Sequence, residues 1–302
     1  MPYDMTPLPE GLAFTKGHGT GNDFVLYADP AGERPLTKDL AVALANRRFG
    51  IGGDGVIRAV RVAALADSLG ATRAPVDTDA EWFMDYRNSD GSIAEMCGNG
   101  IRVFVAFLID EGLADLADGG SIQIGTRAGP VLVRREDQDY VVDLGTWKFC
   151  GGQGAVRRGC DVRVFAAGLE RPLGALSIDV GNPHVVAAVT EEELEALDLS
   201  AAPRLVPAPE HGANVEFALV DQSAGVIKMR VYERGSGETL SCGTGAAAAG
   251  LAAWAWAGAA GPTTWTVNVP GGTLRVRMMD DVVELSGPAE LVAKGEVISS
   301  SN

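Results

Sequence analysis

Short runs in which apolar and polar residues alternate make up most of the chain, and Gly, Asn, Asp and Pro separate them. A period of two is typical of β-strands, and strands that follow one another closely favour antiparallel pairing. The strands predicted in this way are 81–87, 121–124, 130–134, 140–144, 174–180, 226–232, 264–269, 273–278 and 282–285. Strands should therefore dominate the fold.

Helical periodicity is limited to a few segments. One amphipathic helix is predicted from Thr37, a good N-cap residue, through Arg47 and Arg48 to a stop at Gly50, and another over 191–197. Two further helices begin at Cys97 and Cys242 and are apolar on nearly all sides. Helices of this kind are usually buried, so each is expected to lie at the centre of a core.

The segment 240–274 contains no charged residue, and its first part is strongly apolar. That part consists mostly of Ala and Gly, which drive membrane insertion weakly, and Pro262 and Pro270 follow among residues typical of strands. A helix buried in the protein core explains this pattern better than a membrane span does.

Two sequence patterns recur in the same order. Cys-Gly-x-Gly begins at Cys97 and again at Cys242, and each copy precedes an apolar helix. Gly-Asn occurs at Gly21 and again at Gly181, in each case upstream of its own cysteine motif. The repetition predicts two related domains, each of which directs one cysteine-led helix toward a shared cleft.

Composition and charge narrow the classes of function. The 302 residues have the make-up of a globular protein with a sizeable core, and two domains are the default for this length. A net charge of −15 without Lys/Arg clusters argues against nucleic acid and anionic membranes as partners. The first residues show no secretory signal, so a cytoplasmic location is expected. The four cysteines form no C-x-x-C pair, so no metal site is expected.

A cysteine at a helix N-terminus lies where unpaired N–H groups and the helix dipole favour the thiolate. The same N–H groups can hold a carboxylate. Two such helix starts on opposite sides of a substrate carbon would let one thiolate remove a proton while the opposing thiol delivers another. This chemistry inverts a stereocentre and needs no cofactor. Cys150 and Cys160 lack the glycine context and are interpreted as structural.

On these motifs the chain resembles the diaminopimelate epimerases over nearly its whole length. The family's motifs occur in the family's order at 19–24, 88–91, 96–100, 181–184, 214–215, 232–235 and 241–245. The resemblance implies an isomerase that interconverts LL- and meso-diaminopimelate, a small-molecule substrate, in the route to lysine and peptidoglycan precursors. It also implies that Cys97 and Cys242 are the acid and base.

The resemblance assigns roles to further residues, position by position. Asn22, Asn88, Asn182, Asn214 and Arg234 would bind the distal amino-acid end and the α-amino group, which amide side chains suit as donor and acceptor. The amides of Gly98, Asn99, Gly243 and Thr244 would hold the reacting carboxylate. His184 and Glu233 would tune the cysteines, and Glu233 can instead bind the substrate ammonium.

The family fold is α+β, with two pseudo-symmetric domains of mostly antiparallel strands around a buried helix and an active site in the interdomain cleft. Applied to this chain, it gives an N-terminal domain of residues 1–140, completed by a strand in 288–302, and a C-terminal domain of 141–287. The resemblance also implies a homodimer, which the sequence itself does not establish.

The chain departs from the family pattern in three places. Gly55 stands where some members have a substrate-binding Gln, so that contact must be replaced or lost. The segment 61–80 and part of 150–160 look like insertions and are expected to be mobile surface loops.

Three alternatives remain open. A proline or hydroxyproline racemase shares the paired cysteines, but its first motif normally has His where this chain has Asn99. A cysteine hydrolase would use one cysteine as nucleophile with His184 as base. A binding protein would retain the cleft without turnover. Independently of these, two thiols facing one cleft predict an inactivating Cys97–Cys242 disulfide under oxidising conditions.

Overall fold

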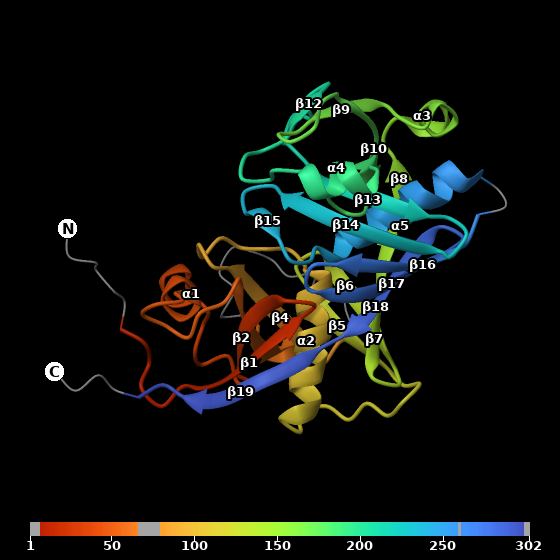
Figure 1. Ribbon diagram of the computed structural model, residues 1–302. Coiled ribbons are helices and arrows are strands. Elements are labelled where there is room, and N and C mark those ends of the chain that lie inside the picture. The colour runs from red at the N-terminus through yellow and green to blue at the C-terminus, as the bar shows by residue number, and fades with distance from the viewer. Residues whose placement is uncertain (1–6, 66–78, 259–260, 299–302) are drawn as a thin grey trace, which may run out of the picture. The chain divides into compact units, whose positions relative to one another are not determined.

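The computed structural model describes residues 7–65, 79–258 and 261–298 of the 302-residue chain. The chain divides into two compact units, which Figure 1 shows as sets of strands around one long helix each. Unit 1 comprises Met1–Val142 and Pro288–Asn302, and unit 2 comprises Asp143–Gly287.

Strands outnumber helices among the described residues of unit 1. They are β1 (Ala13–Gly19), β2 (Asn22–Ala28), β3 (Gly55–Arg61), β4 (Trp82–Asn88), β5 (Ser121–Thr126), β6 (Gly129–Glu136), β7 (Asp139–Thr146, which continues into unit 2) and β19 (Glu290–Glu296). β1 and β2 form an antiparallel hairpin, β2 runs parallel to β3, and β3 pairs antiparallel with β4. β19 returns from the end of the chain to pair antiparallel with β1.

The helix α2 (Gly98–Asp110) lies inside these strands and packs against β1, β2, β3 and β19 (Figure 1). Its first eleven residues are all buried, which explains why its sequence has no polar face. Cys97 is its N-cap residue, as the sequence predicts. A short 3₁₀ helix, η1 (Val62–Ala64), follows β3.

Unit 2 contains β8 (Lys148–Phe149), α3 (Gly152–Arg158), β9 (Val162–Phe165), β10 (Leu173–Asp179), β11 (Pro183–Ala188), α4 (Glu191–Ala196), β12 (Arg204–Val206), β13 (Asn214–Asp221), β14 (Val226–Glu233), β15 (Gly237–Thr239), α5 (Gly243–Ala257), β16 (Thr264–Val269), β17 (Gly272–Met279) and β18 (Val282–Pro288). Its central helix is α5, which packs against β10, β11, β13, β14, β16 and β17. Cys242 is the N-cap residue of α5.

The strand pairings of unit 1 recur in unit 2 in the same order. The β10–β11 hairpin corresponds to β1–β2, and β11 runs parallel to β13 as β2 does to β3. β13 and β14 are antiparallel, and β14 is parallel to β16 across the connection that contains α5. β4 is likewise parallel to β5 across the connection that contains α2. The predicted α+β class with two related halves is confirmed.

Two local predictions were wrong. The helix α1 (Lys38–Ala45) begins after Thr37 as predicted but ends before Asn46, because the Asn46 side chain accepts the N–H groups of Arg48 and Phe49 and so interrupts the helical bonds. The segment 150–160 is not a loop, since it contains α3. Of the proposed insertion 61–80, residues 66–78 lie outside the described residues.

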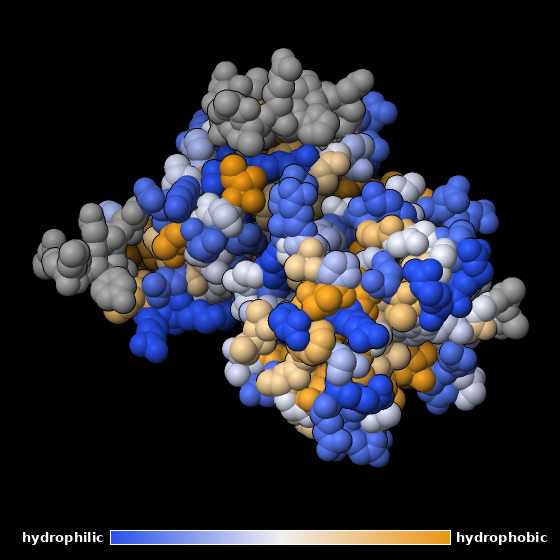
Figure 2. Space-filling model, turned by 90° about the horizontal axis from the view of Figure 1, so that it is seen from above, coloured by the Kyte–Doolittle hydropathy of each residue, from blue (hydrophilic) through white to orange (hydrophobic). Residues whose placement is uncertain are grey.

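In the described parts of the chain, no helix is both long and apolar enough to span a membrane. The apolar segment that suggested one is α5, whose residues 245–253 are all buried. The face in Figure 2 shows hydrophilic residues interspersed with smaller hydrophobic areas. Such a mixture is ordinary for the surface of a folded domain.

Candidate active site

A tight hairpin turn precedes each of two candidate asparagines. Gly21 and Gly181 adopt φ angles of 82° and 83°, a left-handed conformation that favours glycine. The next residue is Asn22 in one turn and Asn182 in the other, at the start of a strand beside the central helix. Each unit thereby places one amide side chain beside the first turn of its own cysteine-led helix.

Cys97 uses its sulfur to cap its own helix. Sγ accepts the N–H of Gly100 at 3.4 Å, and the Cys97 thiol donates its hydrogen to Asn22 Oδ1 at 3.6 Å. The thiol is partly exposed. A sulfur that receives a backbone N–H at a helix N-terminus is favoured in its charged form.

Arg102 is a fully buried cation one turn further along α2. Its guanidinium donates to the carbonyl of Gly98 at 3.0 Å and to that of Pro288 at 3.3 Å. Burial lowers the pKa of Arg102 to about 10, and the negative charge of Cys97 acts in the opposite direction. Arg102 therefore remains charged at neutral pH, close enough to Cys97 for the two charges to interact.

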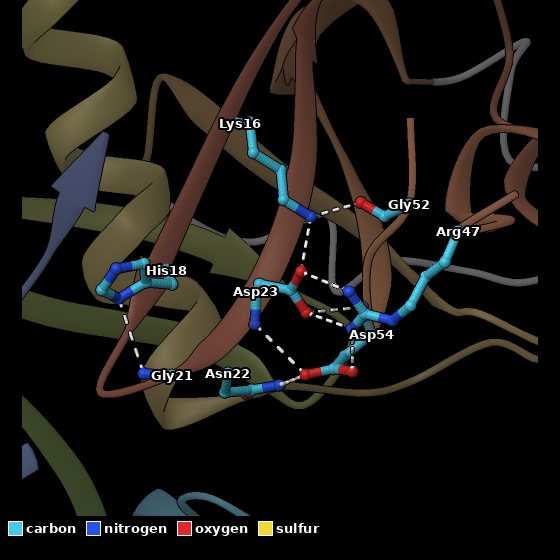
Figure 3. Close-up of polar contacts among 8 residues, drawn as sticks. All are labelled: Lys16, His18, Gly21, Asn22, Asp23, Arg47, Gly52 and Asp54. Carbon is cyan, nitrogen blue, oxygen red and sulfur yellow. Dashed lines mark hydrogen bonds and ion pairs between the residues drawn. The ribbon is translucent and has the colours of Figure 1, made fainter. Parts of the chain in front are cut away.

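Asp54 fixes the orientation of the Asn22 amide, as Figure 3 shows. Asn22 Nδ2 donates to Asp54 Oδ2 at 2.8 Å, and a carboxylate can only accept. The other end of the amide, Oδ1, therefore faces Cys97 and also accepts from Asn99 Nδ2 at 3.3 Å. Cys97, Asn22 and Asn99 thus form one connected group in unit 1.

Asp23 is the centre of an ion cluster that holds Asp54 in place (Figure 3). Its carboxylate lies 2.5 Å from Lys16 Nζ and 2.6 Å from Arg47 Nη2, and Arg47 also contacts Asp54 at 2.8 Å. Burial raises the pKa of Asp23, but hydrogen bonds and charge from Arg47 and Lys16 outweigh it and leave that pKa lowered. Asp23 therefore stays ionised well into acid.

Asn88 is held by its neighbours on β4 and in the following turn. Tyr86 donates its hydroxyl to Asn88 Oδ1 at 2.9 Å, and Asn88 Nδ2 donates to Ser92 Oγ at 3.0 Å. A Cβ atom at Gly55 would lie 2.5 Å from the Tyr86 ring. Tyr86 thus fills the space beside position 55, which explains why this chain has no Gln there.

Cys242 is buried, with 6% of its surface exposed. Its Sγ lies 3.6 Å from Thr244 Oγ1. Burial raises the pKa of the Cys242 thiol well above its usual value, and the carboxylates of Glu233 and Glu216 raise it further. Hydrogen bonds from Thr244 and the Gly245 amide act in the opposite direction. The surroundings of Cys242 favour the neutral thiol.

Glu233 ends β14 and receives a hydrogen bond from the Thr239 hydroxyl. Burial raises the pKa of its carboxyl group, while the bond from Thr239 lowers it. The charge of Glu216 also raises this pKa, and His184 and Cys242 lower it. Glu233 thus belongs to the same electrostatic group as Cys242, as its predicted tuning role requires.

His184 lies in β11, and its side chain is fully buried in unit 2. Its Nδ1 atom lies 2.7 Å from Glu216 Oε1, and its Nε2 atom lies 2.9 Å from Asn182 Oδ1. Sequence reasoning missed Glu216, although a carboxylate between apolar positions of Asn214–Asp221 was a signal that could have revealed it.

Asn214 and Arg234 contact each other at the ends of β13 and β14. Asn214 Oδ1 accepts the Arg234 N–H at 2.9 Å, and Arg234 Nη1 donates to the carbonyl of His211 at 2.6 Å. The Arg234 side chain is exposed. Its guanidinium is thus held by the His211 carbonyl, and a guanidinium offers further N–H donors to a carboxylate.

Several of the predicted residues form one connected group in each unit, while Asn214 and Arg234 form a separate pair. Unit 1 joins Asn22, Cys97 and Asn99, and the Ser89 amide links the Asn88 turn to Asp54 at 2.9 Å. Unit 2 joins Asn182, His184 and Thr244 with Cys242. Within 7–65, 79–258 and 261–298, no three His, Cys, Asp or Glu side chains are arranged to hold a metal ion, and all four cysteines are free thiols.

Structural comparison shows the same fold in several solved proteins. A PhzF-family phenazine biosynthesis protein from Bacillus anthracis matches with a TM-score of 0.65 at 14% identity, over 96% of this chain and all of that one. A hydroxyproline epimerase from Agrobacterium vitis with bound trans-4-hydroxy-L-proline matches with a TM-score of 0.61 at 12% identity, over 97% of this chain and 92% of that one.

Sequence comparison gives much closer relatives. The family model described as diaminopimelate epimerase matches residues 14–150 and 176–292. The diaminopimelate epimerase of Thermobifida fusca is 44% identical over 95% of this chain and 98% of its own length. That of Streptomyces coelicolor is 43% identical over 96% of both chains. The chain therefore belongs to the diaminopimelate epimerase family.

Proposed function

We propose that the chain interconverts LL- and meso-diaminopimelate by moving a proton at one α-carbon, as an isomerase of lysine biosynthesis. The observation that carries the proposal is the pair of cysteines, each the N-cap residue of a buried helix at the same place in a repeated topology. The 44% identity to a diaminopimelate epimerase over 95% of the chain supports this substrate.

In the direction that starts with the Cys97 thiolate, this sulfur takes the α-proton and becomes a thiol. The electron pair left on carbon is delocalised into the α-carboxylate, which the amides of Gly98, Asn99, Gly243 and Thr244 would stabilise. The Cys242 thiol then gives its proton to the opposite face of the carbon and becomes a thiolate. The reverse reaction exchanges these roles, so protons and charge balance in both directions.

The remaining candidates would bind the parts of the substrate that do not react. Asn22, Asn88, Asn182 and Asn214 offer amide donors and acceptors to an ammonium and a carboxylate, and Arg234 offers a second carboxylate contact. Glu233 and His184 would tune the Cys242 side, where the pKa of the thiol is raised. Glu233 can also accept the α-ammonium.

The proposal includes the cellular setting. Two catalytic thiols need a reducing compartment, which supports a cytoplasmic location. A homodimer and the absence of nucleic-acid and membrane partners stay predictions, as does the absence of a cofactor. An oxidised Cys97–Cys242 disulfide also stays a prediction, and its test is loss of activity with oxidant that a reductant reverses.

The decisive experiment is incubation of the purified protein with LL-diaminopimelate in deuterated water. One α-carbon of each turned-over molecule should acquire deuterium, and the meso isomer should accumulate to equilibrium. Cys150→Ala is the matched control and should retain full activity, because this exposed thiol has no predicted role. Absence of both exchange and isomerisation would contradict the proposal.

A second candidate activity is racemisation of proline or hydroxyproline, which the fold shared with the Agrobacterium vitis protein favours. The same deuterium experiment with L-proline and trans-4-hydroxy-L-proline separates the two activities. Exchange with the imino acids alone would replace diaminopimelate as the substrate. A third outcome would identify a cysteine hydrolase instead. In that case the protein would hydrolyse an ester, and replacement of one of the two cysteines would leave this activity intact.

A further inference from the structure

A chain of four polar contacts connects a buried carboxylate to the Cys242 sulfur. It runs from Glu216 through His184, Asn182 and Thr244, with contacts of 2.7, 2.9, 3.3 and 3.6 Å. We propose that Glu216 is a positioning residue: it holds His184 doubly protonated, and this fixes the direction of every hydrogen bond that leads to Cys242. This inference extends the proposed function, and only its kinetic test, the measurement of epimerisation, rests on that function.

The Glu216 carboxylate lies in a closed site, where Oε1 contacts His184 and the buried Oε2 atom has no hydrogen-bond partner among the described residues. The side chains of Glu216 and His184 are both inaccessible to solvent. A Cβ atom at Gly245 would lie only 2.6 Å from Glu216 Oε1, so the carboxylate oxygen touches the first turn of α5. The carboxylate thus lies beside the N-terminus of α5, where the helix dipole attracts negative charge.

The direction of the bonds follows from the donors available. Asn182 Nδ2 faces the Thr244 hydroxyl, so Asn182 presents its oxygen to His184 Nε2, and this nitrogen must carry a proton. An ionised Glu216 can only accept a hydrogen bond from His184 Nδ1, so Nδ1 must carry the second proton. His184 is then an imidazolium whose charge the Glu216 carboxylate neutralises.

The consequence for Cys242 lies at the other end of the chain. Thr244 Oγ1 accepts from Asn182, so its own hydrogen is free to point at the Cys242 sulfur. A hydroxyl that donates to sulfur stabilises the thiolate, which forms when Cys242 gives up its proton. Without a proton on His184 Nε2, the Asn182 amide is free to flip, and the Thr244 hydroxyl would then point away from the Cys242 sulfur.

Glu233 is another titratable group that interacts with His184. Glu233 interacts with Glu216, His184 and Cys242, and burial raises the pKa of its carboxyl group. Glu216 is thus one of two acidic side chains near Cys242, and it is the one in direct contact with His184. Because of this contact, a substitution of Glu216 should change the protonation of His184 more directly than a substitution of Glu233.

The first test observes His184 directly and does not depend on catalysis. Nitrogen-15 NMR of the full chain with labelled histidine gives three imidazoles, and His184→Gln identifies the signal of His184. Both His184 nitrogens should be protonated at neutral pH, and Glu216→Gln should remove one proton. A neutral His184 in the unaltered protein, unchanged by Glu216→Gln, would overturn the proposal whether or not the protein is an epimerase.

The second test measures epimerisation. Glu216→Gln should lower kcat by roughly 10- to 100-fold, the scale for residues that orient functional side chains, with little change in KM. Its remaining activity should be relatively higher at about pH 6 than at about pH 8, because His184 regains its second proton in acid. Glu216→Asp should restore part of the activity and the normal pH profile.

Glu195→Gln is the matched control, since Glu195 is an exposed carboxylate in the same unit. Thermal denaturation of each variant shows whether it folds, and Glu216→Asp retains the charge if the Gln variant does not fold. An active parent protein with a fully active Glu216→Gln would reject the inference and leave the proposed function intact. A parent protein without epimerase activity would reject the proposed function, while NMR still decides the state of His184.

Discussion

The start of α2 and the start of α5 share the sequence Cys-Gly-x-Gly, but their electrostatic surroundings differ. Cys97 lies near the buried cation Arg102, is partly exposed, and accepts the Gly100 N–H. Cys242 is buried beside Glu216 and Glu233, which together with burial raise the pKa of its thiol. The same backbone element therefore lies beside a buried cation in one unit and, in the other, among carboxylates that favour the neutral thiol.

The two hairpin asparagines differ in a similar way. Asp54, whose side chain is 45% exposed, orients Asn22 from within an ion cluster. The fully buried pair of His184 and Glu216 orients Asn182. Buried polar contacts are stronger than exposed ones and cost more to break. The polar group around Asn182 is thus desolvated, whereas the group around Asn22 is partly accessible to solvent.

The largest expected effect comes from removing either sulfur. Cys97→Ala and Cys242→Ala should each lower the rate of LL-to-meso conversion by about 1,000-fold or more, because a two-base reaction needs both a proton acceptor and a proton donor. Chiral chromatography of the products measures this rate. If either variant kept substantial epimerisation, the pairing of the two helix starts in one reaction would be wrong.

The second glycine of each motif should respond differently to alanine. At Gly245 the added methyl would lie 2.6 Å from Glu216 Oε1 and 3.2 Å from Cys242 Cβ, whereas at Gly100 its nearest contact, Cys97 Cβ, is at 3.3 Å. Gly245→Ala should cost about 1–3 kcal/mol of unfolding free energy and about 100-fold in activity, as overpacked sites do. Gly100→Ala should change stability by no more than about 1 kcal/mol.

Urea denaturation and the epimerase assay check both variants. Equal losses of stability and activity in Gly100→Ala and Gly245→Ala would show that the contact between the Glu216 carboxylate and α5 does not make the two helix starts different.

Periodicity and capping residues predicted both central helices but only nine of the nineteen strands among the described residues. Residues 97–109 and the Ala-rich segment after Cys242 are apolar on nearly all sides, which predicts buried helices. The repeated Gly-Asn and Cys-Gly-x-Gly motifs indicated the duplication. The end of α1 could not be predicted, because it depends on which backbone N–H groups the Asn46 side chain accepts. That choice is made by local geometry and leaves no pattern in the sequence.

The chemistry of the site was only partly predictable. The cysteines and asparagines stand in motifs, so their positions could be identified from the sequence. Glu216 and Arg102 could not be assigned roles, because a charged residue in an apolar segment does not reveal its partner across the sheet or in the next turn. The fold decides whether such a buried charge meets a hydrogen-bonding or oppositely charged partner. With a partner it can support the site, and without one it destabilises the protein.

The difference between the two thiols can be measured by alkylation. With iodoacetamide and no substrate, Cys97 should react at least about 10-fold faster than Cys242 near pH 8, because thiolates are the reactive form and Cys242 has a raised pKa and little exposure. The rate at Cys242 should still be rising at pH values above the usual thiol range. Peptide mass spectrometry quantifies both rates, and faster labelling of Cys242 would reverse the assignment of base and acid.

The smallest expected effect is at Asp54. In Asp54→Asn the side chain keeps its size but can donate as well as accept, so it no longer dictates which end of the Asn22 amide faces Cys97. KM for LL-diaminopimelate should rise severalfold, roughly 3- to 10-fold, with kcat changed less, because about 1 kcal/mol is the usual worth of one partly exposed hydrogen bond. Initial-rate kinetics separate the two constants, and Asp143→Asn is a control in a carboxylate outside both groups. A loss as large as that expected for Glu216→Gln would mean that the exposed and buried supports matter equally, and that burial does not set the difference between the two halves.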